Sequence, residues 1–281
     1  MHPNASWMSP DPDDAITAVD LHTDRAHTAR IYDYVIGGKD NFAADREAAE
    51  RTLAAAPFLR TSMRANRACM QRIIRHLAAE HGISQFLDIG TGIPTSPNVH
   101  EVAQAVDPAT RVVYMDNDPI VLAHARALLR SAPQGRTAYI DGDLREPEAA
   151  LADPALTGTL DLDRPIALTI IAVLQFVPDE EAVPLLRRYM DALPSGSFLA
   201  LTIRTADTDP DGAARVTAGY GDAGIHSITR TRAEAEALFK AAGTELVAPG
   251  IQLTCRWLPD EAASRLTETQ VSMYAGVARK P

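Results

Sequence analysis

Apolar and polar residues change their spacing near residue 85, and this change separates two kinds of predicted structure. From residue 25 to about residue 81, alanine-rich stretches alternate with arginine and glutamate, and Ile73, Ile74 and Leu77 recur at helical spacing. From Gln85 onward, short apolar runs alternate with segments of helical spacing. The chain therefore predicts a Rossmann-like, doubly wound and mostly parallel α/β sheet preceded by a helical region.

The apolar runs after residue 85 predict the strands of this sheet. Segments with helical spacing separate most of them, as expected for parallel strands joined by crossover helices. Two of these helices are predicted to begin at Ser96-Pro97 and at Asp118-Pro119, where a capping residue precedes a proline. The predicted strands, in chain order, are QFLDI, RVVYMD, TAYIDGD, PIALTIIAV, GSFLALTIR, IQLTCRW and VSMYAGVAR.

Two segments lack the periodicity of either element. Residues 1–24 contain proline and aspartate without a regular apolar pattern, and they predict a flexible arm. Residues 205–228 are rich in glycine and aspartate, and they predict a mobile loop or a small insert. We expect the rest of the chain, 25–281, to form one domain, with a helical cap over 25–84 and a sheet core over 85–281.

A glycine turn follows the first predicted strand, in the stretch FLDIGTGIPTS. Open α/β sheets bind ligands beyond the carboxyl ends of their strands, where Gly90, Thr91 and Gly92 are expected to lie. Glycine allows a positive φ and a close approach of backbone to ligand, so we expect a bulky residue at Gly90 to remove binding without disturbing the fold. Taken alone, the pattern is equally typical of a tight turn that binds nothing.

Three acidic residues make a ligand site the better interpretation. Asp88, Asp116 and Asp143 stand at the ends of three consecutive predicted strands. Asp88 could contact an ammonium group of a ligand. Asp116 could accept hydrogen bonds from both hydroxyls of a ribose, and Asp143 could accept one from an exocyclic amine. Aspartate is also a common helix cap, which is the alternative. Acids at this edge disfavour a pyrophosphate, and a dinucleotide fingerprint would need glycine at Thr95.

Together these residues resemble the cofactor pocket of class I methyltransferases, which use S-adenosylmethionine and release S-adenosylhomocysteine. The resemblance implies a seven-stranded sheet whose last strand, Met273–Arg279, is antiparallel. It also implies a ribose bound by Asp116, and it departs from the common pattern at Pro94, where many members carry a third glycine. The cofactor residues that it implies are Asp88, Gly90, Thr91, Gly92, Asp116, Asn117, Asp143, Leu144 and Ala172.

Longer segments resemble one actinobacterial family of S-adenosylmethionine methyltransferases, first described as a domain of unknown function. The similar segments include ARIYDYVIGGKDNFAADR, QFLDIGTGIPT, RVVYMDNDPIVLAHARALL and AVLQFVPD, and the resemblance spans about residue 25 to the C-terminus. The family usually has histidine where this chain has Gln175. If a general base acts at that position in the family, it is missing here. His226, in the predicted mobile loop, is a second candidate base.

The segment from Tyr32 to Phe42 is predicted to close over the cofactor and to form part of the acceptor site. It combines Tyr32 and Tyr34 with a donor-rich turn that contains Asn41. In the alternative interpretation, the tyrosines only pack against the sheet domain and the turn only breaks a helix. Arg64, Asn66 and Arg67 could reach the same cleft from a helix, although a solvated helix face is the better interpretation for Arg64.

Composition narrows the function further. The net charge of −10 disfavours nucleic acid as a partner, so a small-molecule acceptor is expected. The histidines have no metal-ligand spacing, and the longest apolar run, from Ile166 to Val177, is too short for a membrane span. Without a secretion signal, we expect a cytoplasmic protein with Cys69 and Cys255 as buried thiols.

The function predicted from the sequence is methyl transfer from S-adenosylmethionine to an unknown acceptor. Methyl transfer to an already activated donor depends largely on positioning, so the sequence need not contain any particular catalytic residue. The alternative is a protein that binds or senses S-adenosylmethionine without catalysis. The oligomeric state is left open.

Overall fold

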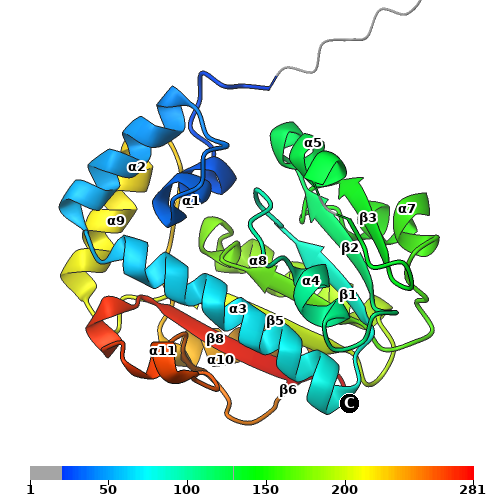
Figure 1. The fold of residues 1–281 in the computed structure, drawn as a ribbon. Helices are drawn as coiled ribbons and strands as arrows, with labels where there is room; N and C mark the ends of the chain where they lie inside the picture. Colours follow the sequence, from blue (N-terminus) through cyan, green and yellow to red (C-terminus); the bar gives the residue numbers. More distant parts are fainter. Residues whose placement is uncertain (1–20, 129) are drawn as a thin grey trace, which may run out of the picture.

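The computed structural model describes residues 21–128 and 130–281, and a mixed β-sheet lies at its centre (Figure 1). Within these residues the sheet has eight strands, in the order β3-β2-β1-β4-β5-β8-β6, with β7 paired to β8. The strands β1 to β5 are parallel, whereas β8 runs antiparallel to β5. The strands are β1 (Gln85–Ile89), β2 (Arg111–Asp116), β3 (Arg136–Asp141), β4 (Ala167–Ile171), β5 (Phe198–Arg204), β6 (Glu245–Leu246), β7 (Gln252–Leu253) and β8 (Met273–Arg279).

Helices precede the sheet and separate most of its strands. They are α1 (Thr28–Ile36), α2 (Ala43–Ala55), α3 (Leu59–His81), α4 (Val99–Gln104), α5 (Pro119–Leu128), α6 (Pro147–Ala152), α7 (Pro154–Thr157), α8 (Asp179–Ala192), α9 (Pro210–Asp222), α10 (Arg232–Ala241) and α11 (Glu261–Ser264). In the part of the chain that the structure describes, none of these helices is long and apolar enough to cross a membrane. The predicted fold class is confirmed, including the antiparallel strand at Met273–Arg279.

Alternate residues of each strand bury opposite faces of the sheet, because successive side chains of a strand point to opposite sides. Phe86 and Val112 pack with α3 and α4 on one face. Leu87 and Val113, their neighbours in sequence, pack with α8 and α10 on the other. Figure 1 shows α3 running along the first face, in front of β8 and β5. Both faces are covered at the centre of the sheet, which explains why β4 and β5 are almost entirely buried and mostly apolar.

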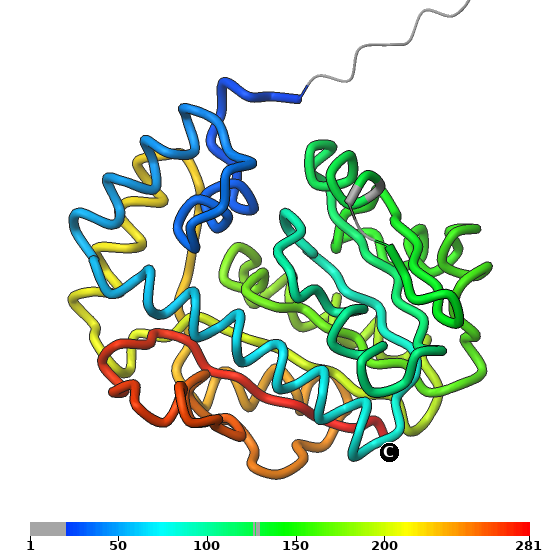
Figure 2. Tube along the Cα trace, in the orientation of Figure 1, coloured from blue at the N-terminus to red at the C-terminus, as the bar shows by residue number. Residues whose placement is uncertain are grey.

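A separate apolar cluster holds a helical cap above one edge of the sheet. It joins α1, α2, the start of α3 and α9. Residues far apart in the chain meet here, and Figure 2 shows α2 and α9 side by side. Val216 and Tyr220 of α9, one helical turn apart, contribute to the cluster with Ile31 and Val35 of α1. The cap is therefore built from the predicted N-terminal helices together with one helix from much later in the sequence.

The mobile loop predicted for residues 205–228 is wrong, because most of this segment is helix α9. Asp209 caps the helix by accepting a hydrogen bond from the Gly212 backbone, and Pro210 occupies its first position. A Cβ added to Gly219 would lie 2.4 Å from the Thr52 hydroxyl oxygen of α2. The glycine that weakens the helical signal in the sequence thus permits the close approach of two helices.

Smaller differences concern the ends of elements. Helix α4 begins at Val99 with Asn98 as its cap, two residues later than predicted from Ser96-Pro97. The predicted strand IQLTCRW is reduced to the two-residue β7, and β6 was not predicted. The cysteines Cys69 and Cys255 are buried and free, as expected. Of the arm predicted over residues 1–24, residues 1–20 lie outside the described residues.

Candidate functional site

A cavity of about 240 Å³ lies at the carboxyl ends of the parallel strands, with the helical cap on its other side. The turn after β1, the end of β2, the loop after β3 and the end of β5 all contribute to its wall. Helices α1, α3 and α9 supply the opposite wall through Tyr32, Met63 and Tyr220. Because parallel strands present their carboxyl ends at one edge, residues predicted separately along the chain meet here.

The structure brings together all nine residues predicted to bind the cofactor. Each of them lines this cavity, although they come from four different strand ends. These residues are Asp88, Gly90, Thr91, Gly92, Asp116, Asn117, Asp143, Leu144 and Ala172.

The glycine turn is held by the neighbouring strand. The Gly90 N–H donates to the Met115 carbonyl at 2.8 Å, and the Gly92 N–H donates to Oδ2 of Asp116 at 2.8 Å. Gly90 and Gly92 have φ of +69° and +66°, a region that favours glycine. The turn is thus shaped by two positive-φ residues and by the carboxylate that ends β2.

The two glycines differ in what surrounds them. A Cβ at Gly90 would lie 2.3 Å from Cγ2 of Val173, whereas a Cβ at Gly92 would meet nothing within 4 Å. The expectation that a bulky residue at Gly90 would spare the fold is therefore wrong, because Val173 already fills that space. Gly92 is the position with free room beside the cavity.

A pair of alanine substitutions tests this difference. We expect Gly90→Ala to lower the free energy of unfolding by about 2–5 kcal/mol, because a left-handed backbone and a packing clash add. Gly92→Ala carries only the backbone strain, about 1–2 kcal/mol. Urea denaturation of both variants measures the difference. Equal losses of stability would contradict the packing of Val173 against Gly90.

Asp116 is buried, and both of its oxygens are already oriented by the backbone. Oδ2 accepts from the Gly92 N–H, and Oδ1 accepts from the Asp118 N–H at 3.0 Å. Burial raises the pKa of Asp116, and these two hydrogen bonds oppose that effect. Each carboxylate oxygen can accept more than one hydrogen bond, so both can still receive a hydroxyl from a ligand.

The other two acids of the site have different surroundings. Asp88 accepts hydrogen bonds from the hydroxyls of Thr169 at 2.6 Å and Thr91 at 2.7 Å. Burial raises the pKa of Asp88, and these hydroxyls lower it in part. Asp143 accepts from the Arg145 N–H at 2.8 Å and from the Asn117 amide at 3.4 Å. Asp88 is therefore an internal anchor of the turn, and Asp143 is the more open carboxylate.

Of the residues predicted to form the lid or the acceptor site, Tyr32 and Gln175 line the cavity. The Tyr32 hydroxyl donates to the Met63 carbonyl at 2.9 Å and accepts from the Asn66 amide at 3.1 Å. This leaves Oδ1 of the fully buried Asn66 without a partner among the residues described. Gln175 donates to the Ala172 carbonyl at 2.7 Å, and its Oε1 is likewise unpartnered within the described chain.

The other four predicted residues are not among those lining the cavity: Tyr34, Asn41, Phe42 and His226. Tyr34 binds Glu50 on the outside of the cap, and His226 is exposed. The Asn41 amide donates to Asp33 of α1 at 2.8 Å and to the Gly38 carbonyl of its own turn at 3.2 Å. Phe42 is the N-cap residue of α2, and the centroid of its ring lies 5.6 Å from Cζ of Arg30. The glycine-rich turn thus organises the cap itself rather than the cavity.

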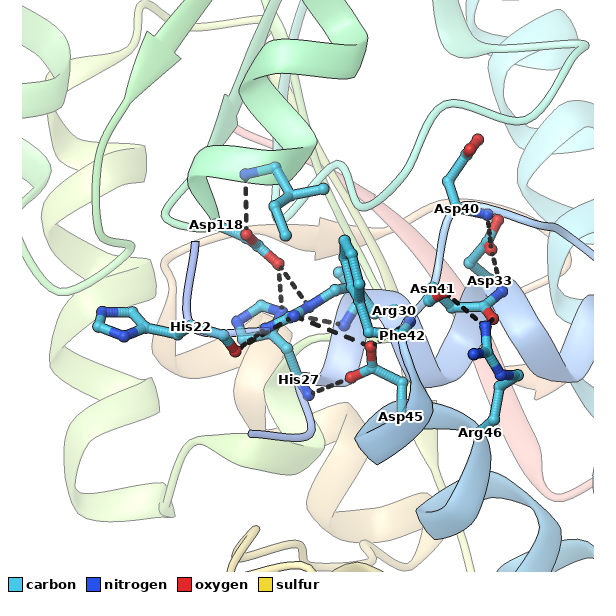
Figure 3. Close-up of polar contacts among 12 residues, drawn as sticks. His22, His27, Arg30, Asp33, Asp40, Asn41, Phe42, Asp45, Arg46 and Asp118 are labelled. Carbon is cyan, nitrogen blue, oxygen red and sulfur yellow. Dashed lines mark hydrogen bonds and ion pairs between the residues drawn. The ribbon is translucent and has the colours of Figure 1, made fainter. Parts of the chain in front are cut away.

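An ion-pair cluster joins the cap to Asp118, two residues after the end of β2 (Figure 3). Nε of Arg30 and Nδ1 of His27 lie 3.2 Å and 3.0 Å from Oδ2 of Asp118. Arg30 also lies 3.8 Å from Asp45, which accepts from the His27 backbone at 2.8 Å. Burial raises the pKa of Asp118, but its bonds and its positive neighbours outweigh this effect and lower it overall. Since the Asp118 N–H orients Asp116, the cluster connects the cap to the ribose side of the predicted site.

The sequence did not predict a role for several residues in or near the cavity. Arg67, considered only as able to reach the cleft, donates to the Pro97 carbonyl at 3.1 Å and to Asn98 at 3.2 Å, which holds the loop after the glycine turn. Arg204 is a charged residue at the end of an apolar strand, and that position marks the ligand edge of a parallel sheet. His100 of α4 is buried, and its Nδ1 lies 2.8 Å from the Tyr114 hydroxyl.

Comparison with known proteins identifies the family. A family model described as S-adenosyl methyltransferase matches residues 14–281. The chain belongs to this family. Membership assigns S-adenosylmethionine-dependent methyl transfer to the enzyme, and with it the cofactor that was predicted. The comparison with curated proteins returned no match.

Solved structures agree with this assignment. The enzyme is 52% identical to a DUF574 family protein from Streptomyces avermitilis MA-4680, with a TM-score of 0.90, over 93% of this chain and 100% of that one. It is 38% identical to a candidate methyltransferase from Thermobifida fusca YX, with a TM-score of 0.85, over 95% and 99% of the two chains. The actinobacterial family predicted from the sequence is thus confirmed.

A more distant structure shows the shared fold alone. Magnesium protoporphyrin IX methyltransferase from Synechocystis PCC 6803, solved with bound S-adenosylhomocysteine, has a TM-score of 0.53 and 11% identity. The match covers 89% of this chain and 93% of that one. It supports the class I methyltransferase fold that was predicted.

Proposed function

We propose that the enzyme binds S-adenosylmethionine over β1, β2 and β3 and methylates a small molecule held under the helical cap. Asp116 accepts hydrogen bonds from both ribose hydroxyls, and Asn117, Asp143 and the Leu144 backbone surround the adenine. The free room beside Gly92 and the remaining lone pairs of Asp116 fit such a ligand. When bound, S-adenosylmethionine supplies a methyl group that is already activated on a sulfonium.

The observation that carries this proposal is the two-sided wall of one cavity. The glycine turn and Asp116 lie on one side, and Tyr32, Met63 and Tyr220 of the cap lie on the other. An acceptor beside the cofactor is therefore enclosed by helices, which favours a small molecule over a macromolecule. The net charge of −10 also disfavours nucleic acid.

Gln175 lies on the acceptor side of the cavity, where it positions the acceptor and does not act as a base. Gln175 is fixed by its hydrogen bond to the Ala172 carbonyl, so its free Oε1 can accept a hydrogen bond from the acceptor. An amide does not take up a proton at neutral pH, so Gln175 cannot replace a catalytic histidine. Catalysis then depends mainly on holding the two reactants in line.

The rival function is binding of S-adenosylmethionine without catalysis, and the substitution at Gln175 is the feature that favours it. Calorimetric titration with S-adenosylhomocysteine tests the shared binding step. An assay that detects S-adenosylhomocysteine formed from S-adenosylmethionine, with a panel of small carboxylic acids, phenols and amines, tests transfer. Binding with turnover supports the proposal, binding without turnover on any acceptor supports the rival, and no binding refutes both.

A further inference from the structure

Arg204 is a buried cation whose partners in this structure are uncharged. It ends β5, borders the cavity and is 5% exposed. Nη1 donates to the Ser227 hydroxyl at 3.1 Å, and Nη2 donates to the Ala213 carbonyl at 3.1 Å and to the Thr217 hydroxyl. Nε has no hydrogen-bond partner in the described part of the chain. Burial lowers the pKa of Arg204 to about 10, so the side chain remains charged at neutral pH.

Other buried arginines of this protein are paired with acids. Arg30 lies 3.2 Å from Asp118, and Arg230 lies 2.7 Å from Asp179. No carboxylate within residues 21–128 and 130–281 pairs with Arg204, whose neighbouring ionisable group is the neutral Tyr220. A buried charge without a counter-charge is costly, and an anion bound beside it offsets that cost.

The position of Arg204 assigns its charge to the acceptor side of the cavity. The glycine turn, Asp116 and Asp143 follow β1, β2 and β3, on one side of β4. Arg204 ends β5, on the other side of β4. A cofactor held over the first three strands, and reaching Ala172 at the end of β4, therefore leaves the end of β5 to the acceptor.

The walls around this charge are apolar and aromatic. Met63, Phe176, Val216 and Tyr220 line the same cavity. The rings of Phe176 and Tyr220 meet edge to face, with centroids 5.5 Å apart. These surfaces suit a flat apolar body, and the unpartnered Nε–H of Arg204 suits an anionic oxygen at the end of that body, which it can bind by a charge-assisted hydrogen bond.

We propose that the methyl acceptor is a small carboxylic acid with an apolar or aromatic body, and that Arg204 binds its carboxylate. This inference rests on the proposed function, because it places the acceptor in the same cavity as the cofactor. The unpartnered oxygens of Asn66 and Gln175 then face a hydroxyl or amine of the acceptor. The bonds from Arg204 to Ala213 and Thr217 also attach α9 to the sheet, so its structural role must be separated from binding.

The test compares cinnamate with its uncharged amide, cinnamamide, by ligand-observed NMR titration. Wild-type protein is titrated with and without saturating S-adenosylhomocysteine, whose own affinity is measured by calorimetry. We expect cinnamate to bind at least about tenfold more tightly than the amide, as for a charge-assisted hydrogen bond. Equal affinities of the acid and the amide would overturn the proposal.

Variants then assign the preference to one residue. Arg204→Met should lower the affinity for cinnamate to the affinity for cinnamamide. Arg204→Lys should keep part of the preference for cinnamate over cinnamamide. Arg215→Met is the control, because Arg215 is an exposed arginine on the same helix α9 that does not line the cavity. A preference that survives in Arg204→Met would overturn the proposal. If Arg204→Met does not fold, the wild-type comparison and Arg204→Lys decide.

The two proposals fail in different ways. Absence of S-adenosylhomocysteine binding refutes the proposed function, and the cofactor-free titration still shows whether Arg204 selects a carboxylate. Normal S-adenosylhomocysteine binding without a preference for cinnamate refutes the acceptor class alone.

Discussion

Replacing Asp116 with alanine is expected to weaken binding of S-adenosylhomocysteine by about 10- to 100-fold, the usual cost of a lost charge-assisted hydrogen bond. The effect has two sources. The ribose loses its acceptor, and the Gly92 and Asp118 N–H groups lose the carboxylate that orients them. Calorimetric titration of both proteins measures the change. Asp116→Asn should retain part of the affinity, because its amide offers one acceptor in place of two oxygens.

Asp141→Ala provides a matched control for Asp116. Asp141 pairs directly with Asp116 in the β2–β3 ladder, but it is exposed and does not line the cavity. The Asp141→Ala substitution removes one negative charge, as Asp116→Ala does, but from the end of the adjacent strand. If Asp141→Ala weakens binding as much as Asp116→Ala, a general field effect explains the loss and the ribose assignment is wrong.

Breaking the ion-pair cluster between cap and sheet is the second change with a large expected effect. Arg30→Met removes a cation from between Asp118 and Asp45, and both carboxylates stay buried. Because, among the residues described, Asp45 then has no cation and Asp118 only His27 beside it, and a buried charge that loses its counter-charge is costly, we expect a loss of about 3–5 kcal/mol in the free energy of unfolding. Urea denaturation measures it, and hydrogen exchange should show faster exchange in α1 and α2.

An exposed ion pair in the cap supplies the comparison for Arg30. Arg51 lies 2.6 Å from Glu47 on the surface of α2, and both side chains are largely solvated. Arg51→Met should therefore change stability by less than about 1 kcal/mol. If Arg30→Met is no more destabilising than Arg51→Met, the cluster does not hold the cap in place.

The same cluster has a predictable pH dependence. The pKa of Asp118 is lowered in the folded protein from the ordinary value of 3.8. Its stabilising contribution is therefore complete above that value, and it is lost as the pH falls through the lower folded value. Asp118→Asn should flatten this part of the acid-denaturation curve.

Much of the cofactor side of the site could be predicted from local sequence. Gly90, Gly92 and Asp116 follow apolar strands, and strand ends in a parallel sheet meet at one edge, so their proximity depends only on fold class. The prediction for Gly90 failed in one respect, because the side chain that fills the space next to it, Val173, comes from a distant part of the chain. Contacts of this kind have no local signal.

The acceptor side was harder to predict, for a related reason. Tyr34, Asn41 and Phe42 look like site residues because they are aromatic or polar and lie close to Tyr32 in sequence. In a helix, however, residues two apart face different directions, so Tyr32 points to the cavity and Tyr34 to the outside of the cap. The glycines of α9 concealed a helix, because glycine lowers helix propensity wherever it stands, including positions where it allows close packing.

The sequence by itself determined the alternation of strands and helices and the glycines and acids at the cofactor edge, because these follow from local periodicity and turn chemistry. The antiparallel last strand was implied by the resemblance to class I methyltransferases. Only the tertiary structure decided which helices enclose the cavity, that Arg30 and His27 meet Asp118, and that Arg204 is buried without an acid among the residues described. These features depend on packing between segments far apart in the chain. The free-energy cost of a charge depends on how deeply it is buried. Burial results from that packing and not from any single stretch of sequence.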